Sequence, residues 1–479
     1  MKKRLKGPKL HIASTRLSQK VNTKLTDNPW KSIQIDRPFP LPSYVKEALQ
    51  KLNGAGHLAY IVGGSVRDFL LSQDSKDHDI ATSAHPDEIC RIFPQSVTVG
   101  KAFGVIQVPV DSHLPLLEIA SFRQDLEYQD FRHPKKVVFS DALKDAWRRD
   151  FTVNALFYDA KTQRILDATG GLEDLKQKVI RAIGDPYQRF KEDALRLLRA
   201  VRFQTRLNFK LDPQTARAIQ GTVKLINKVS HERIRDELTQ LWMGPNPAQA
   251  LQALSDLGLL PLLIPELEAL KGMAQIPSSY RKEDLWSHLL KMVQHLAEKN
   301  PVRSEALAWA AVLHESGKPL VSSKNEGENF NGHEIEGASL ALSIAQRFKI
   351  SRDVSDRIYK IVMDHLKFRD VFQMRESTLQ RLIREPHFEE LLKFYEADAI
   401  TLDGNLAFYE FCYSKYQELA KNPESYWVRL IDGKDLIALG FRPGPQFSEI
   451  LRTIEDLALE KKLLTQEEAL SYVVKNFLK

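Results

Sequence analysis

This chain contains only two cysteines in 479 residues, and that scarcity excludes a disulfide-stapled fold. Cys90 and Cys412 lie far apart in the sequence, so they indicate neither a disulfide framework nor a cysteine zinc site. No apolar run approaches the ~20 residues that a membrane-spanning helix needs, so no membrane contact is expected. The basic residues 1–9 are not followed by the apolar segment of a secretory signal. These absences predict a cytoplasmic protein.

The composition that remains is globular and moderately basic. Hydrophobic residues make up 43% of the chain, and 69 Lys and Arg against 62 Asp and Glu give a formal net charge of +7. Positive charge favours a polyanionic partner, and both RNA and nucleotides are compatible with it. No obligate protein partner is evident from the sequence.

The spacing of apolar residues changes near residue 171. Before it, short β-branched runs such as Ala59–Val62 alternate with helical stretches, whereas after it apolar residues recur every three or four positions. We therefore predict an α+β head with a mixed sheet, followed by a long all-helical body. The predicted divisions are a basic flexible arm at 1–35, the head at 36–171, a helical neck at 172–275, a helical domain at 280–370 and a helical tail at 371–479.

A pair of glycines marks the first candidate site. Residues 61–71 read as a strand, a turn at Gly63 and Gly64, and a helix. Such a turn lets backbone amides and a helix N-terminus face an anion, with Arg67 as a fork-shaped donor to a phosphate. Two glycines before a helix are by themselves usually only a turn, so a phosphate site needs support from neighbouring residues.

Two carboxylates downstream of the turn give that support. Asp77 and Asp79 lie two residues apart, and in a strand this spacing puts both on one face, where they can hold a pair of Mg2+ ions. In two-metal catalysis, one ion activates a hydroxyl for attack on an α-phosphate, and the other stabilises the leaving pyrophosphate. Glu118, in an apolar strand, is a candidate third carboxylate, and it reads equally well as a strand-edge acid in a salt bridge.

The segment 192–203 predicts a helix with one charged face. Asp193, Arg196 and Arg199 recur every three residues, either as a solvated stripe with an intrahelical salt bridge or as a reader of bases. An Asp acceptor beside an Arg donor complements the amino group and neighbouring ring nitrogen of cytosine or adenine. Uracil and guanine present a carbonyl and an N–H there, and such a buried mismatch discriminates strongly. The helix would thus accept C and A without a template.

The combined motifs resemble the nucleotidyltransferase signature of the polymerase-β superfamily, and more closely the bacterial CCA-adding enzyme and poly(A) polymerase family. The residues that carry the first match are Gly63, Gly64, Arg67, Asp68, Asp77, Asp79 and Thr82. Residues 148–155 resemble the second motif of the family, and 192–203 resemble its base-reading motif. The resemblance implies a polymerase-β-like head that uses Mg2+ to add nucleotides to the 3′ end of RNA.

The resemblance also implies roles for individual residues. Arg149 is implied to contact the nucleotide, Asp193 and Arg196 to read the base, and Arg199 and Arg202 to lie near the nucleotide.

Two other segments favour tRNA as the RNA substrate. Val97–Val108 looks like the tRNA-specific members, and 122–134 resembles the loop that helps the family switch from C to A addition, which disfavours a CC-only enzyme. We therefore predict addition of CCA to tRNA from CTP and ATP. An A-adding enzyme and a poly(A) polymerase remain alternatives.

Residues 285–366 look like an HD phosphohydrolase domain. Histidines and a carboxylate from several helices can bind a divalent ion, and the candidate ligands here are His288, His314, Glu315, His333 and His365. The defining His-Asp pair of that domain is His314-Glu315 in this chain, and the extra methylene displaces the carboxylate. Scattered histidines are also common as ordinary core residues. Two further alternatives are an HD-type phosphohydrolase whose N-terminal half only binds nucleotide, and a non-catalytic RNA-binding protein.

Overall fold

The computed structural model describes residues 29–75, 78–98, 100–110, 116–128, 134–274, 284–324, 330–421 and 429–478. Its head is built on a seven-stranded sheet with the order β1-β9-β8-β2-β3-β5-β4. The pair β3·β5 is parallel and the other pairs are antiparallel, so the sheet is mixed, as predicted. The strands are β1 Lys31–Gln34, β2 Ala59–Val62, β3 Asp79–Thr82, β4 Val105–Val108, β5 Leu117–Ser121, β8 Leu156–Asp159 and β9 Arg164–Asp167.

Side-chain alternation gives the central strands two different faces. Ile61, Ile80 and Ile119 are fully buried in the main core on one face. The other face carries a smaller cluster that includes Ala81 and Phe157. Asp79 points to the same side as Ala81 because the strand period is two. The acidic end of β3 therefore faces away from the main core.

The sheet also includes residues that the sequence assigned to a flexible arm. Lys31–Gln34 pairs with β9 at the edge of the sheet, and the preceding Trp30 packs edge-on against Phe157 with ring centroids 5.5 Å apart. The predicted arm of 1–35 is therefore too long by these residues, because apolar contacts fix them. Its residues 1–28 lie outside the described residues.

Helices and a hairpin complete the head. The helices are α1 Ser43–Gly54, α2 Gly64–Leu70, α3 Pro86–Ile92 and α4 Ala142–Arg148, with the 3-10 turns η1 Lys101–Phe103 and η2 Thr152–Asn154. The strands β6 Arg123–Tyr128 and β7 Pro134–Phe139 pair as a separate hairpin. Residues 129–133 of the predicted switching loop, and Val99 of the other tRNA-specific segment, lie outside the described residues.

In the described residues after the head, the elements are helical apart from a short two-stranded ladder of β10 Val179–Ile180 and β11 Lys210–Leu211. The neck contains α5 Gly171–Gln177, α6 Pro186–Glu192, α7 Arg196–Leu207, α8 Pro213–Thr222, η3 Val223–Lys228, α9 His231–Trp242, α10 Pro247–Asp256, α11 Leu260–Leu263 and α12 Pro265–Glu268. The next group contains α13 Leu285–Lys299, α14 Glu305–Leu313, α15 Lys318–Lys324, α16 His333–Arg347, α17 Arg352–Asp364, η4 Lys367–Asp370, α18 Glu376–Arg384, α19 Phe388–Leu402 and α20 Ala407–Lys421.

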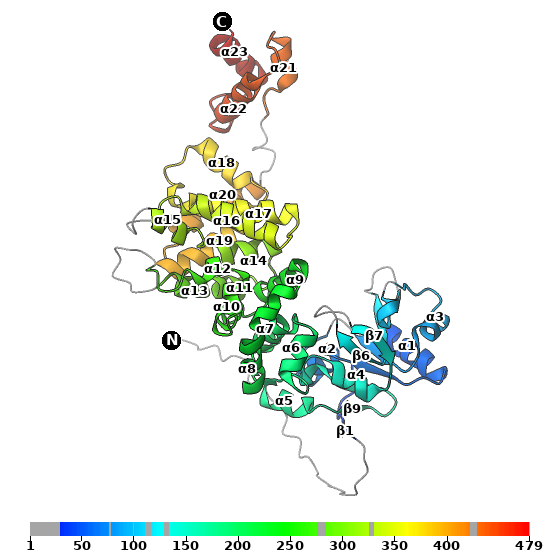
Figure 1. The fold of residues 1–479 in the computed structure, drawn as a ribbon. Helices are drawn as coiled ribbons and strands as arrows, with labels where there is room; N and C mark the ends of the chain where they lie inside the picture. The colour runs from blue at the N-terminus through cyan, green and yellow to red at the C-terminus, as the bar shows by residue number, and fades with distance from the viewer. Residues whose placement is uncertain are drawn as a thin grey trace, which may run out of the picture.

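The last three helices form a group of their own. They are α21 Gly433–Ala438, α22 Pro445–Leu459 and α23 Gln466–Phe477, and they lie at the opposite end of the molecule from the head (Figure 1). Their hydrophobic cluster is separate from the main core, which runs from the head through the neck into the body. Arg381 of α18 forms ion pairs with Glu455 and Asp456 of α22 and so links the group to the body.

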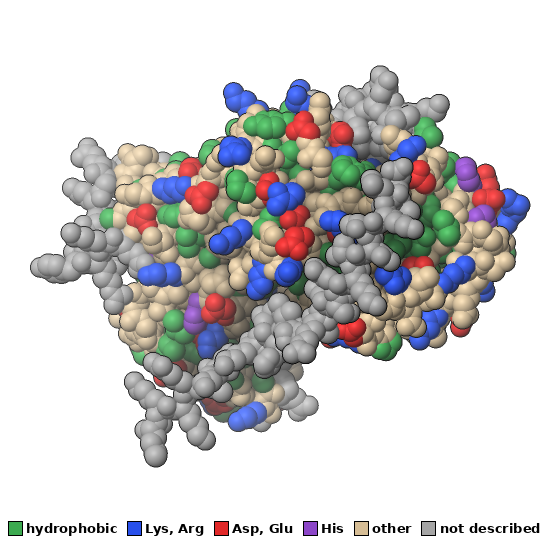
Figure 2. Space-filling view, turned by 90° about the horizontal axis from the view of Figure 1, so that it is seen from below, with side chains coloured by type: hydrophobic (Ala, Val, Ile, Leu, Met, Phe, Trp, Pro, Cys, Tyr) green, Lys and Arg blue, Asp and Glu red, His purple; other side chains and the backbone are tan. Residues whose placement is uncertain are grey.

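The outer surface drawn in Figure 2 carries side chains of both charges. In one face of the molecule, Lys and Arg side chains are interspersed with Asp and Glu rather than gathered in one patch (Figure 2). Within the described part of the chain, no helix is both long enough and apolar enough to cross a membrane.

Candidate functional site

A pocket of about 650 Å3 lies where the head meets the neck. Its lining combines the strand-turn-helix of the head with residues along the whole of α7, and it contains eight arginines. These arginines are Arg67, Arg123, Arg148, Arg149, Arg196, Arg199, Arg202 and Arg206. Because every guanidinium is a permanent cation with several N–H donors, this lining suits a polyphosphate.

The glycine turn lies at the wall of this pocket. Gly63 precedes α2 and has φ +75°, a conformation that glycine adopts at little cost. A Cβ built on Gly63 would lie 3.5 Å from Arg149 Nη1 and 3.9 Å from Asp79 Oδ2. The turn therefore brings the helix start, the cation Arg149 and the carboxylate of Asp79 together, and Gly64 is the first residue of α2.

The three carboxylates predicted to bind metal, Asp77, Asp79 and Glu118, differ in their position relative to the pocket. Asp79 is the first residue of β3 and lines the pocket. Asp77 lies outside the described residues. Glu118 is exposed on the parallel neighbour β5, and the register Ile80↔Ile119 puts it on the same sheet face as Asp79. It is not among the lining residues, and it accepts a hydrogen bond from Gln107 at 3.2 Å.

Arg67 is buried and makes side-chain hydrogen bonds that the sequence did not indicate. Its Nε donates to Asp68 Oδ1 at 2.8 Å, and its Nη1 donates to Asn154 Oδ1. Burial lowers the pKa of Arg67, while the contact with Asp68 opposes that shift. The side chain lines the pocket, but it also ties α2 to the η2 turn.

Arg149 stands directly after α4, against the glycine turn. Its Nη2 donates to Asp145 Oδ2 at 3.0 Å, and its guanidinium lies 5.2 Å from the ring centroid of Phe157. Burial opposes ionisation of Asp145, yet the charges of Arg149 and Arg148 hold its pKa below the usual value. A buried carboxylate thus fixes two of the arginines that face the pocket.

The predicted continuous helix over 192–203 is wrong at its start. The helix α6 ends at Glu192, Asp193 is extended with φ −140° and ψ 103°, and α7 begins only at Arg196. The Asp193 carboxylate accepts a hydrogen bond from the backbone N–H of Leu195 at 3.2 Å, a local bond that competes with helix formation. Because of this break, Asp193 lines the pocket from an extended segment and not from the helix face that was predicted.

Asp193 and Arg196 both line the pocket, but they are not paired with each other. Asp193 accepts from Arg233 Nη2 of α9 at 3.2 Å. Arg196 donates to Glu192 Oε2 at 2.9 Å and to the carbonyl oxygens of Arg189 and Arg148, both at 3.1 Å. Each side chain is therefore held in one orientation by a partner that the sequence did not reveal.

Arg199 and Arg202 connect the pocket to α9. Arg199 Nη2 donates to Asp150 Oδ2 of the head at 2.6 Å, and Arg202 Nε lies 3.0 Å from Glu237 Oε2. Burial disfavours ionisation of Asp150, but the charge and hydrogen bonds of Arg199 lower its pKa to about 2. Burial raises the pKa of Glu237.

Sequence reasoning missed Arg233 and Glu237, which reach toward the pocket from α9. The available signal was their spacing, because residues four apart share a helix face, here with opposite charges.

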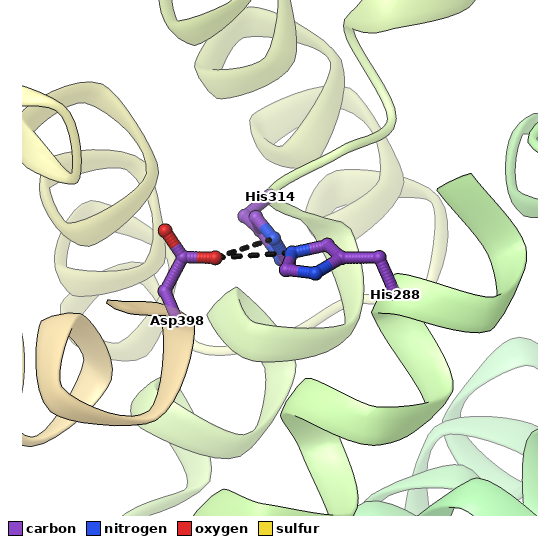
Figure 3. A group of neighbouring side chains, drawn as sticks. All are labelled: His288, His314 and Asp398. Carbon is purple, nitrogen blue, oxygen red and sulfur yellow. Dashed lines mark hydrogen bonds and ion pairs between the residues drawn. The ribbon is translucent and has the colours of Figure 1, made fainter. Parts of the chain in front are cut away.

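The helical body contains a second cluster, built from three helices. The rings of His288, on α13, and His314, directly after α14, both point to the carboxylate of Asp398 on α19 (Figure 3). Nε2 of His288 is 3.0 Å and Nε2 of His314 is 3.9 Å from Asp398 Oδ1. One ligand atom from each residue lies within 4.8 Å of the others, and all three residues are buried. Sequence reasoning missed Asp398, although an acid between two alanines of a helix was its signal.

Glu315 takes a different place from the one expected. Its Oε2 lies 2.6 Å from Lys318 Nζ, while its Oε1 lies 3.6 Å from His288 Nε2 and 3.5 Å from His314 Nε2. Burial opposes ionisation, but Lys318 and His314 hold the pKa of Glu315 well below its usual value.

The remaining histidines lie beside this cluster. The rings of His365 and His333 are 5.2 Å apart, and those of His365 and His314 are 5.8 Å apart. In His314, His333 and His365, Nδ1 contacts the carbonyl oxygen of the residue three positions earlier. Burial, together with the neighbouring histidines, lowers the pKa of His365 to about 3. Such backbone contacts orient an imidazole so that Nε2 is available to a metal.

Models of known families match three parts of the chain. The poly A polymerase head domain matches residues 59–181, the probable RNA and SrmB-binding site of polymerase A matches 208–271, and the HD domain matches 285–402.

Whole-length relatives are also similar. The CCA-adding enzyme of Lactobacillus helveticus is 34% identical over 88% of this chain and 94% of its own length, and that of Enterococcus faecalis is 32% identical over 90% and 95%. The structure resembles the Bacillus stearothermophilus CCA-adding enzyme in complex with CTP, with a TM-score of 0.69, 26% identity, and coverage of 91% of this chain and 98% of that one. The fold also matches a Thermotoga maritima CCA-adding enzyme complexed with tRNA, with a TM-score of 0.58, 21% identity, and coverage of 91% and 96%.

The pairing of Asp150 with Arg199 predicts a pH-dependent loss of stability in Arg199→Met. Because the folded pKa of Asp150, about 2, is below its ordinary 3.8, the pair stabilises the fold above about pH 4, and this contribution is lost as the pH falls toward 2. Removing Arg199 leaves a buried unpaired carboxylate, which costs about 3–5 kcal/mol near neutral pH. The lone Asp150 then binds a proton at higher pH. The drop in thermal midpoint should therefore be larger at pH 7 than at pH 4.5.

The matched control is Arg91→Met on α3, whose side chain is 77% exposed. It should leave the thermal midpoint unchanged at both pH values. An equal loss at pH 7 and pH 4.5 in Arg199→Met would contradict the assignment.

Proposed function

This chain belongs to the CCA-adding enzyme family, and from that premise we propose that it adds C, C and A to the 3′ end of tRNA, taking them from CTP and ATP. The observation that carries the proposal is one pocket that joins Asp79 and the glycine turn of the head to Asp193 and Arg196 of the neck. The similarity to CCA-adding enzymes over nearly the whole chain supports it.

The head supplies the groups for the chemistry. Asp79, with Asp77 and with Glu118 from the neighbouring strand, would hold Mg2+, because carboxylate oxygens are the ligands that this ion prefers. When bound, the ions lower the pKa of the attacking hydroxyl and neutralise charge on the triphosphate. The fit is supported by Asp79 Oδ2, which lies at the glycine turn where the phosphates would meet the amides of α2. Arg149, beside that turn, is oriented by Asp145 to donate to the phosphates.

The neck supplies the groups that select the base. The carboxylate of Asp193 accepts from the amino group of cytosine or adenine, and Arg196 donates to the adjacent ring nitrogen. Both are held by partners outside the base, namely Arg233 and Glu192, so they need not reorganise when the nucleotide binds. Arg199 and Arg202 complete the cationic wall beside the nucleotide.

We also propose a division of labour along the chain. Residues 36–171 carry out catalysis, 172–275 read the base and bind RNA, 280–370 form the HD-like domain, and 371–479 hold the tRNA, with a basic arm that ends before Trp30. The family models over 59–181 and 208–271 support the first two ranges, whereas the HD model extends to residue 402, past the proposed boundary at 370 and over Asp398. The proposal locates the protein in the cytoplasm, where the unpaired Cys90 and Cys412 stay reduced.

A second proposal concerns the cluster in the body. His288, His314 and Asp398 would hold one divalent transition-metal ion, a set of two imidazoles and a carboxylate that leaves further positions open. His314 Nε2 is buried and faces Asp398 Oδ1 at 3.9 Å and Glu315 Oε1 at 3.5 Å, so it lies among oxygen atoms that can share a metal ion with it. Glu315 forms an ion pair with Lys318, so we do not include it among the proposed metal ligands. His333 and His365 border the site.

Incorporation of labelled CTP and ATP tests the main proposal. The substrates are tRNA transcripts that end at the discriminator base, after one C and after two C, with Mg2+ and a sequencing gel as the readout. The wild-type protein should complete all three to CCA. Asp79→Ala should reduce the rate by about 10³-fold or more, because metal contacts are worth several kcal/mol in the transition state. Asp87→Ala, an exposed acid of the same head, should not.

Each other result selects an alternative. A single A added only to the transcript ending in CC would make this an A-adding enzyme, and long A tails on unrelated RNA would make it a poly(A) polymerase. No incorporation with any RNA would overturn nucleotidyl transfer and favour a function of the HD-like half.

Competition between nucleotides tests the base-reading residues. Asp193→Ala should lower kcat/KM for CTP and ATP by roughly 100-fold and should raise the share of UTP incorporated, because the polar mismatch that rejects uracil is gone. Asp256→Ala, an exposed acid on α10 of the same neck, serves as the control. An unchanged preference for CTP over UTP in Asp193→Ala would refute the role of this carboxylate.

Metal analysis tests the cluster in the body. After purification with Mn2+ or Zn2+ and removal of free ions, the protein should retain about one equivalent of metal, and His288→Ala should lose it while still adding CCA. The control is His387→Ala, another buried histidine that contacts a carboxylate, Asp364, at 3.3 Å outside the cluster. Wild-type protein without metal would show that the Lys318–Glu315 pair alone balances the charge of the cluster.

A further inference from the structure

A second pocket, of about 720 Å3, adjoins the nucleotide pocket. Its walls are α7 and α9 of the neck, and Glu305 of α14 and Ser351 close one side. Two arginines, Arg202 and Arg206, line both pockets. The two spaces are therefore neighbours across one row of α7 side chains.

The arginines of the second pocket differ in how firmly they are held. Arg202 contacts Glu237 and donates to Gln240, and Arg235 donates to Asp236 and to the carbonyl oxygen of Lys349. Arg206 has a side chain that is 52% exposed, and its ion pair with Asp68 spans 3.8 Å. Arg206 is thus the cation at this boundary with the most capacity to bind a further anion.

The neighbouring surface is not purely ionic. Met243, 40% exposed, lines the second pocket beside Gly244 and Pro245 at the end of α9. A flexible thioether adapts to flat surfaces of different shape, and bases of any sequence present such a surface. A cation with an adjoining apolar contact is the combination by which proteins hold single-stranded nucleic acid.

We propose that the second pocket holds the last nucleotides of the RNA strand, with Arg206 paired to a backbone phosphate at its 3′ end. This inference rests on the proposed function, because nucleotidyl transfer requires the 3′ hydroxyl to meet the α-phosphate of a nucleotide in the first pocket. A strand that reaches this point must continue into an adjoining space of at least nucleotide size. The second pocket is such a space, and Arg206 lies on the boundary that the strand crosses.

Steady-state kinetics separate RNA binding from nucleotide binding. With tRNA ending in CC, Arg206→Ala should raise KM for tRNA roughly 10-fold, the loss expected for one charge-assisted phosphate contact, and leave KM for ATP near the wild-type value. Arg91→Ala, an exposed arginine on α3, should leave both constants unchanged. A rise confined to the KM of ATP would overturn the proposal, because Arg206 would then serve the triphosphate. Unchanged constants would overturn it as well.

Binding without nucleotide gives an independent readout. The slope of log affinity for tRNA against log salt should become shallower by about 0.7 in Arg206→Ala, as expected for one lost contact to single-stranded RNA. An unaltered slope would refute the phosphate contact. If the wild-type protein adds no nucleotide, the proposed function itself is wrong. If the wild type is active and Arg206→Ala binds tRNA as the wild type does, only this inference is wrong.

Cross-linking tests the position of the strand. A tRNA carrying 4-thiouridine as its penultimate nucleotide should, on irradiation, form an adduct with the peptide that contains Met243. An adduct only with peptides of the head would place the strand elsewhere and overturn the proposal.

Discussion

The ion pair between Asp150 of the head and Arg199 of the neck is the contact on which the nucleotide pocket depends. Asp150 directly follows Arg149 in the chain, and Arg199 lies one helical turn after Arg196. The pair therefore sets the distance between the residues assigned to the phosphates and those assigned to the base. Because both partners are largely buried, their bond is little screened by water, and the junction is correspondingly rigid.

The same logic extends to the other arginines around the pocket. Cations crowded into one space repel one another, and here acidic side chains offset that repulsion: Asp145 for Arg148 and Arg149, Glu192 for Arg196, and Glu237 for Arg202. Each acid also fixes the direction of the guanidinium that it contacts. These side chains are therefore ordered during folding, so the proposed triphosphate site presents oriented donors before a ligand binds.

Much of this arrangement could be predicted from the sequence where chemistry follows local spacing. The glycine turn, the alternation that sends Asp79 away from the main core and the change from mixed sheet to helices all reflect short-range rules. The exceptions involve competition or distance. Asp193 bonds to the N–H of Leu195 instead of continuing a helix, and helical periodicity does not record such competition. Asp398 joins His288 from 110 residues away, a contact that only tertiary packing creates.

The C-terminal group of α21, α22 and α23 has a hydrophobic core that it shares with no other part of the described chain. Its link to α18 consists of side-chain contacts such as Ser377 with Glu460 and Arg381 with Asp456. Units with separate cores unfold and refold on their own timescales, and a polar seam between them yields before either core does. The apolar packing of this group is therefore independent of the packing at the far end, where the head and neck form the nucleotide pocket.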